Sequence, residues 1–123
     1  MKALLWVLPC LAALFGCATA SQNRAELAQR AQSELVGMSK TDLLSCAGAP
    51  LRSEKAGEVE VLTYVGGGDL VGGPDFAQRR YCEVSFVMRM GRVDKINYAG
   101  RTGGLITKGE QCAFVVENCM RSK

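Results

Sequence analysis

The 123-residue chain contains no histidine, a single tryptophan and no long hydrophobic run. The missing histidine excludes Ser-His and Cys-His nucleophile pairs and every His-ligated metal site. The formal net charge is only +3, without the clustered basic face that marks nucleic-acid-binding domains. We therefore expect no nucleic-acid partner. The apolar run at residues 3–15 is too short to span ~30 Å of hydrocarbon, so we expect no membrane-spanning helix.

The N-terminus has the organisation of an export signal. Met1 and Lys2 form a short positive segment before the apolar run, and small residues follow it. This order is typical of a secretory signal peptide that is removed from the mature protein. We therefore expect the mature chain to be exported.

Two processing sites compete after the apolar run. Residues 14–17, Leu-Phe-Gly-Cys, resemble the bacterial lipobox, in which a small residue precedes a cysteine that is acylated and becomes the new N-terminus. The alternative is an A-x-A site for ordinary signal peptidase at 18–20, with cleavage after Ala20. The Gly-Cys pair directly after the run favours the first site. We predict a signal peptide at 1–16, an acylated Cys17 and a polar tether reaching residue 22. Alanine rather than aspartate at position 18 favours the outer membrane, facing the periplasm.

The six cysteines divide according to this processing. Cys10 leaves with the signal peptide, and Cys17 is acylated or also removed. Both routes leave the same four, Cys46, Cys82, Cys112 and Cys119. An even number in an exported chain predicts two disulfides. A four-cysteine metal site or a redox site would need C-x-x-C pairs, which the sequence lacks, so we expect no metal and no cofactor.

The last cysteines are expected on a helix at residues 107–120. Thr107 and Glu110 have the spacing of a capping box, and a helical apolar face follows it at Cys112, Val115, Val116 and Cys119. Seven residues of helix rise about 10.5 Å, whereas bridged Cα atoms lie within about 7 Å. A Cys112–Cys119 pair is therefore disfavoured. Each should pair with Cys46 or Cys82, in either of two arrangements.

The remaining pattern predicts a single α+β domain at 23–123. Good helix formers cover 23–35, with a stripe of mostly small apolar residues at Ala25, Ala28, Ala31 and Leu35. A second helix begins with Ser39 as its cap, in an S-x-x-D box with Asp42, and ends before Gly48. Alternating residues predict strands at 58–65, 82–90 and 93–98, with a type II′ turn at Gly91-Arg92. We thus expect two N-terminal helices, a three-stranded antiparallel meander and a C-terminal helix tethered by disulfides.

A glycine-rich segment, Gly66–Pro74, separates the first two strands. It lacks the Lys-Ser or Lys-Thr of a phosphate-binding loop, and no dinucleotide-binding fingerprint opens a helix there. We interpret it as a long hairpin loop, and Leu70, Val71 and Phe76 are the residues by which it could contact a partner.

Several short motifs resemble a known family. Gly37-Met38-Ser39-Lys40, followed by Gly48-Ala49-Pro50, is similar to the opening of the SmpA/OmlA (BamE-like) family of small outer-membrane lipoproteins. The segments Val84-Ser85-Phe86 and Gly91-Arg92-Val93 follow in the family's order. The resemblance covers residues 37–98. It implies two helices on one face of an antiparallel sheet, and a role in outer-membrane protein assembly or envelope integrity.

The expected function is therefore partner binding rather than catalysis. No nucleophile or acid–base motif is present, so we expect no enzymatic activity and no small-molecule substrate. The expected partners are outer-membrane lipid, through the acyl anchor, and envelope proteins. The alternative is a soluble periplasmic or secreted binding or inhibitor module, cleaved after Ala20, because the αα-βββ order also resembles the unit of β-lactamase-inhibitor proteins.

Overall fold

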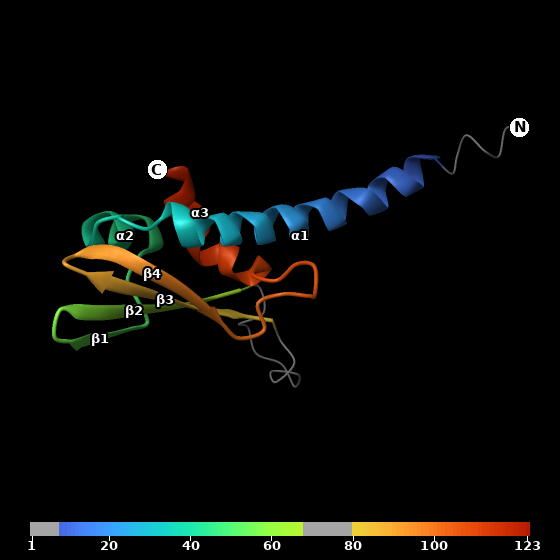
Figure 1. Ribbon diagram of the computed structural model, residues 1–123. Coiled ribbons are helices and arrows are strands. Elements are labelled where there is room, and N and C mark those ends of the chain that lie inside the picture. The colour runs from blue at the N-terminus through green and yellow to red at the C-terminus, as the bar shows by residue number, and fades with distance from the viewer. Residues whose placement is uncertain (1–7, 68–79) are drawn as a thin grey trace, which may run out of the picture.

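The computed structural model describes residues 8–67 and 80–123, the first of them, 8–19, as backbone only. Three helices cover one face of a four-stranded antiparallel sheet, which confirms the expected α+β class (Figure 1). No helix among the described residues is long and apolar enough to cross a membrane. The elements in chain order are α1 (Leu8–Glu34), α2 (Lys40–Ala47), β1 (Arg52–Ala56), β2 (Val59–Gly66), β3 (Cys82–Arg89), β4 (Arg92–Ala99), the 3₁₀ helix η3 (Glu110–Cys112) and α3 (Ala113–Arg121).

Helix α1 is longer than the expected helix at 23–35. Its N-terminal part extends beyond the sheet and the other helices (Figure 1). Residues 18–22, expected as a tether, continue the helix, because no glycine or proline interrupts the chain between Ala18 and Glu34. The predicted small-residue stripe is confirmed as the buried face: Ala25, Ala28, Ala31 and Leu35.

Helix α2 has the predicted ends. The Ser39 hydroxyl accepts a hydrogen bond from the Asp42 amide at 3.2 Å, which satisfies one free donor of the first turn. At the other end Gly48 adopts φ 82°, and its amide donates to the Leu44 carbonyl. This short helix is held by its contacts with α3 and by a disulfide.

The sheet order is β1-β2-β3-β4, with each strand antiparallel to its neighbours. The register places Phe86 between Leu62 on β2 and Ile96 on β4, so that three core side chains form a row across the sheet. The predicted alternation along β3 is confirmed, since Cys82, Val84, Phe86 and Met88 are all buried.

The three-strand prediction is wrong by one strand. Strand β1 has the sequence Arg-Ser-Glu-Lys-Ala and is exposed along its whole length. It pairs with β2 from Arg52↔Thr63 to Ala56↔Val59. An edge strand with charged side chains buries no face, so it carries no hydrophobic alternation by which the sequence could reveal it.

The β3–β4 turn also differs from the prediction. Its central residues are Met90 and Gly91, with φ of 51° and 72°, between the paired Arg89 and Arg92. Positive φ at both central positions defines a type I′ turn rather than type II′. The tip of this turn contacts the start of α2, where the Lys40 amide donates to the Gly91 carbonyl at 2.8 Å.

The C-terminal helix begins later than predicted, because the capping box does not form. Gly109, in the left-handed region, precedes η3 without a side-chain cap, and α3 follows from Ala113. The Thr107 hydroxyl instead accepts from the Gly104 amide at 2.9 Å. The Glu110 carboxylate, expected to cap the helix, pairs with an arginine of α1.

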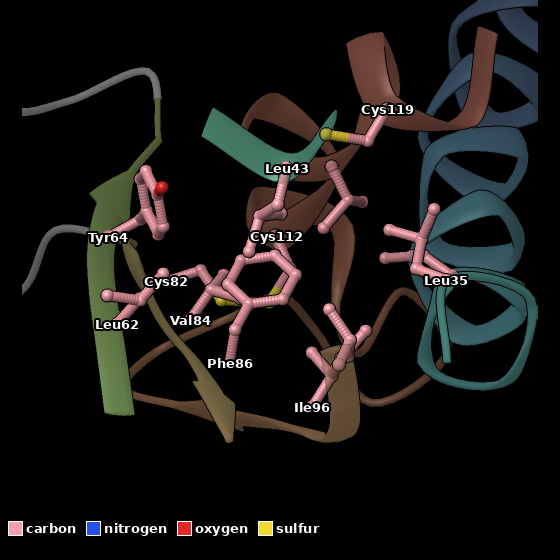
Figure 2. Close-up of a cluster of buried hydrophobic side chains, with 14 of the residues drawn as sticks. Leu35, Leu43, Leu62, Tyr64, Cys82, Val84, Phe86, Ile96, Cys112 and Cys119 are labelled. Carbon is pink, nitrogen blue, oxygen red and sulfur yellow. A yellow bond between two sulfur atoms is a disulfide. The ribbon is translucent and has the colours of Figure 1, made fainter. Parts of the chain in front are cut away.

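The core lies between the sheet and the helices (Figure 2). Its centre is Phe86, whose ring meets Tyr64 edge-on with centroids 5.5 Å apart. Leu35, directly after α1, and Leu43 of α2 close the core from the helical side (Figure 2). Cys82, Cys112 and Cys119 belong to this cluster, and Cys46 packs against it.

Candidate functional site

Cys17, the predicted acylation site, belongs to α1. The N-terminal part of this helix extends away from the body (Figure 1). Ala25 is the first buried residue among those of α1 whose side chains are described. Position 17 precedes Arg24 by seven residues, about 10.5 Å along a helix. An acyl chain at this position would therefore bring the end of the body from which α1 emerges close to a membrane surface.

The two disulfides join the last helical segment to the rest of the fold. Cys46 of α2 pairs with Cys119 of α3, and Cys82 of β3 pairs with Cys112 of η3. The Cα atoms of the pairs are 4.9 Å and 5.0 Å apart. Cys112 and Cys119 thus reach other elements, as the helical rise predicted. Loop-closure entropy assigns each bridge about 4 kcal/mol of stability.

A groove of about 600 Å³ lies next to the Cys46–Cys119 bridge. We call it the α2–α3 groove. Of the described residues that line it, none is charged. Leu51 and Phe114 belong to this lining and are exposed over 69% and 46% of their surface. Its apolar lining consists of Ala47, Ala49, Leu51, Val65, Phe114 and Val115. Exposed apolar side chains gathered around one hollow are typical of a protein contact site.

The groove is shaped by one polar contact and by one close approach. The Tyr64 hydroxyl donates to the Gly48 carbonyl at 2.9 Å, which holds the segment after α2 against β2. Burial raises the pKa of this tyrosine, so the hydroxyl keeps its proton at neutral pH. At Gly66, a Cβ atom would lie 2.6 Å from Val115 Cγ2, so that a side chain there would displace the Val115 side chain from the groove lining.

An ion pair fixes Phe114 at the edge of the groove. Arg24 Nη2 of α1 lies 2.8 Å from Glu110 Oε1, and the Arg24 guanidinium lies 5.9 Å from the centre of the Phe114 ring. The hydrogen bond from Arg24 lowers the pKa of the Glu110 carboxyl, so that the buried carboxylate stays charged. Residues on α1 therefore position an aromatic side chain of the groove.

A second cavity, about 730 Å³, shares Cys46 and Asn118 with the groove. It lies between the end of α1, helix α2 and the C-terminus, and charged side chains contribute to its lining: Glu34, Asp42 and Lys123.

Throughout residues 8–67 and 80–123, no group of three or more acidic, cysteine or histidine residues could hold a metal ion.

The sequence predicts the four disulfide cysteines but does not predict the groove. Leu51 follows a proline outside any periodic pattern, and Phe114 lies off the apolar face of the last helix. A large aromatic residue outside the buried face of a helix is a sign of a contact surface, and this sign could have identified Phe114. The partner contacts expected from Leu70, Val71 and Phe76 lie outside the described residues, as does most of the Gly66–Pro74 loop.

Comparison of the chain with protein-family models, with curated proteins and with solved structures finds no match in any of the three.

Proposed function

We propose that this chain is a non-enzymatic envelope lipoprotein, acylated at Cys17 and anchored to the outer membrane, that binds a protein partner in the periplasm through the α2–α3 groove. The observation that carries the proposal is the groove itself. It exposes Leu51 and Phe114, and the part of the chain that the structure describes contributes no charged residue to its lining. Such a surface offers apolar contact rather than acid–base chemistry. The resemblance to SmpA/OmlA lipoproteins favours outer-membrane protein assembly or envelope integrity as the process.

The position of the groove supports a partner that is itself close to the membrane. Phe114 contacts Arg24, which follows the predicted anchor by about two helical turns. A groove near the anchored end can meet a membrane-embedded partner without a long linker. The ion pair between Arg24 and Glu110 holds this geometry.

The exposed side chains supply enough apolar surface for specific binding. Full burial of a leucine or phenylalanine side chain contributes about 1.5–3 kcal/mol. Aromatic residues often carry much of the binding energy of an interface. We therefore expect Phe114, flanked by Leu51, to be the main contact.

The test is site-specific crosslinking in growing cells, with a photoreactive residue at Leu51 or, as a matched control, at Leu44. Leu44 is also an exposed leucine (37%) but does not line the groove. The proposal predicts a discrete crosslinked product from position 51 that contains an envelope protein, and none from position 44. Equal labelling at both positions, or no product at either, would refute binding through the groove.

The same pair of residues gives a loss-of-binding test. Leu51→Asp should abolish co-purification of the crosslinked partner, because a carboxylate placed in the groove cannot be buried without a large desolvation cost. Leu44→Asp should leave co-purification unchanged. A soluble binding or inhibitor module would instead show its partner in the soluble fraction, with no acyl chain on the protein.

A further inference from the structure

The loop between β4 and η3 exposes two adjacent large apolar residues. Leu105 is 103% exposed and Ile106 is 79% exposed. We call these two residues the apolar tip. Burial would contribute about 1.5–3 kcal/mol for each, so a fully exposed pair is an unused source of binding energy.

The loop that carries the tip has a defined structure. The Thr107 hydroxyl accepts from the Gly104 amide at 2.9 Å, and the Thr102 hydroxyl accepts from the Gly109 amide at 3.1 Å. A Cβ atom at Gly103 would collide with the Thr107 carbonyl, so the turn requires glycine at this position. The backbone is thus bonded within the loop while the tip points to solvent.

Three cations surround the base of the tip. Arg80, Arg101 and Lys108 line a hollow of about 690 Å³ together with Leu105, and none of its described lining residues is acidic. None of the three forms a salt bridge with another residue in the described part of the chain. The hydrogen bond from Arg24 lowers the pKa of the Glu110 carboxyl most, and the charge of Arg80 contributes, but Glu110 forms its ion pair with Arg24.

The loop lies at the end of the body from which α1 extends (Figure 1). Gln29 of α1 donates to the Lys108 carbonyl at 3.4 Å, and Gly109 lies beside Ala28. An anchor at Cys17 would hold this same end toward the bilayer. Exposed apolar residues within a ring of cations match the interface of an anionic bilayer, with acyl chains below and phosphates above.

We propose that Leu105 and Ile106 insert into the surface of a membrane that contains anionic phospholipid, while Arg80, Arg101 and Lys108 bind its phosphate groups. The inference rests on the proposed function only for the anchor that presents the loop to the bilayer. The site would fix the orientation of the body on the membrane and so the direction in which the α2–α3 groove faces.

The test uses tryptophan fluorescence of the purified mature protein. The one tryptophan, Trp6, lies in the predicted signal peptide, so Leu105→Trp places a single fluorophore in the mature chain. Leu51→Trp is the matched control, because it is exposed but lies in the groove. With vesicles of brominated phosphatidylglycerol, the proposal predicts a blue shift and strong quenching for Leu105→Trp and little change for Leu51→Trp. Equal quenching of the two variants, or none at position 105, would overturn it.

The cationic part is tested with a chain that carries Cys17→Ser, so that no acyl chain contributes to binding. Each of Arg101→Gln and Lys108→Gln should weaken binding to phosphatidylglycerol vesicles about five-fold, the value for one cation near an anionic surface. Binding that is equal on phosphatidylcholine, or unchanged by both substitutions, would overturn this part. The two proposals also fail separately, because quenching at position 105 reports the loop whether or not the mature protein carries a lipid.

Discussion

Arg24 Nη2 of α1 lies 2.8 Å from Glu110 Oε1 of η3, and these residues are 86 positions apart in the sequence. The carboxylate is buried, whereas the guanidinium is partly exposed. This pair joins α1, which carries the predicted anchor, to the segment 110–114. That segment contains Cys112 of the second disulfide and Phe114 at the edge of the groove. It therefore connects the orientation of α1 to the shape of the proposed binding surface.

Loss of the Glu110 charge should destabilise the fold. Glu110→Gln should lower the free energy of unfolding at pH 7 by about 1–2 kcal/mol, because a charge-assisted hydrogen bond at a buried site is lost, while the partly exposed arginine limits the cost. Urea unfolding measures the change. The control is Glu117→Gln, which removes a surface pair with Arg121 at 3.5 Å and should cost under about 0.5 kcal/mol. Equal losses would contradict a special role for Glu110.

The same carboxylate should make stability depend on pH. Its pKa is lowered in the folded protein, so its contribution is fully present above the unfolded value of about 4.3. That contribution is lost as the pH falls through the lowered folded pKa. Stability measured from pH 6 down to pH 2 should fall less steeply in Glu110→Gln than in the wild type. Identical profiles would show that another group carries the dependence.

Removal of either disulfide should cost about 4 kcal/mol by the loop-entropy estimate. The double variant Cys46→Ala/Cys119→Ala opens the bridge with the longer separation, 73 residues, and should lose slightly more than Cys82→Ala/Cys112→Ala, with a separation of 30. Denaturant unfolding compares the two variants. Peptide mapping without reduction is the control, and a peptide that links Cys112 to Cys119 would contradict the observed pairing.

Met90→Asn should stabilise the protein. Met90 adopts φ 51° in a type I′ turn and is 88% exposed, so its side chain gains little from packing while its backbone is strained. Asn-Gly is the preferred pair for this turn. We expect a gain of roughly 0.5–1 kcal/mol, measured as a higher denaturant midpoint at an unchanged m-value. A lower midpoint would indicate that the methionine makes a contact the turn needs.

Tyr98→Phe should weaken the packing of α1 on the sheet. The Tyr98 hydroxyl donates to the Ala28 carbonyl of α1 at 2.6 Å. Removal of one such hydrogen bond costs about 0.5–1.5 kcal/mol. Amide hydrogen exchange should show faster exchange in residues 25–34 of the variant, whereas β1, at the far edge of the sheet, should not change. A uniform increase throughout the chain would mean that the bond does not act on α1 specifically.

Regular periodicity was sufficient to predict most of the fold. The stripe that ends at Leu35, the Ser39 cap and the alternation along β3 all appear as expected. In each case one face of the element is buried, so burial leaves a repeating pattern in the sequence. The helical rise likewise excluded a bridge between Cys112 and Cys119.

The features that escaped prediction depend on contacts between distant residues. Strand β1 has no buried face and is formed only by pairing with β2. Glu110 matched a local capping pattern, but the arginine that determines its role lies on α1. The turn at Met90 depends on strand register rather than on its own residues. The groove combines residues of α2, β2 and α3 that no local pattern relates.

The most direct test of the central claim is the intact mass of the mature protein, purified from the cell envelope after expression of the full chain. We expect a chain that begins at Cys17 and carries diacylglyceryl, with or without an additional N-terminal acyl chain. Cys17→Ser should abolish the lipid mass and release the protein from the outer-membrane fraction. An unmodified chain that begins at Ser21 would contradict the lipid anchor.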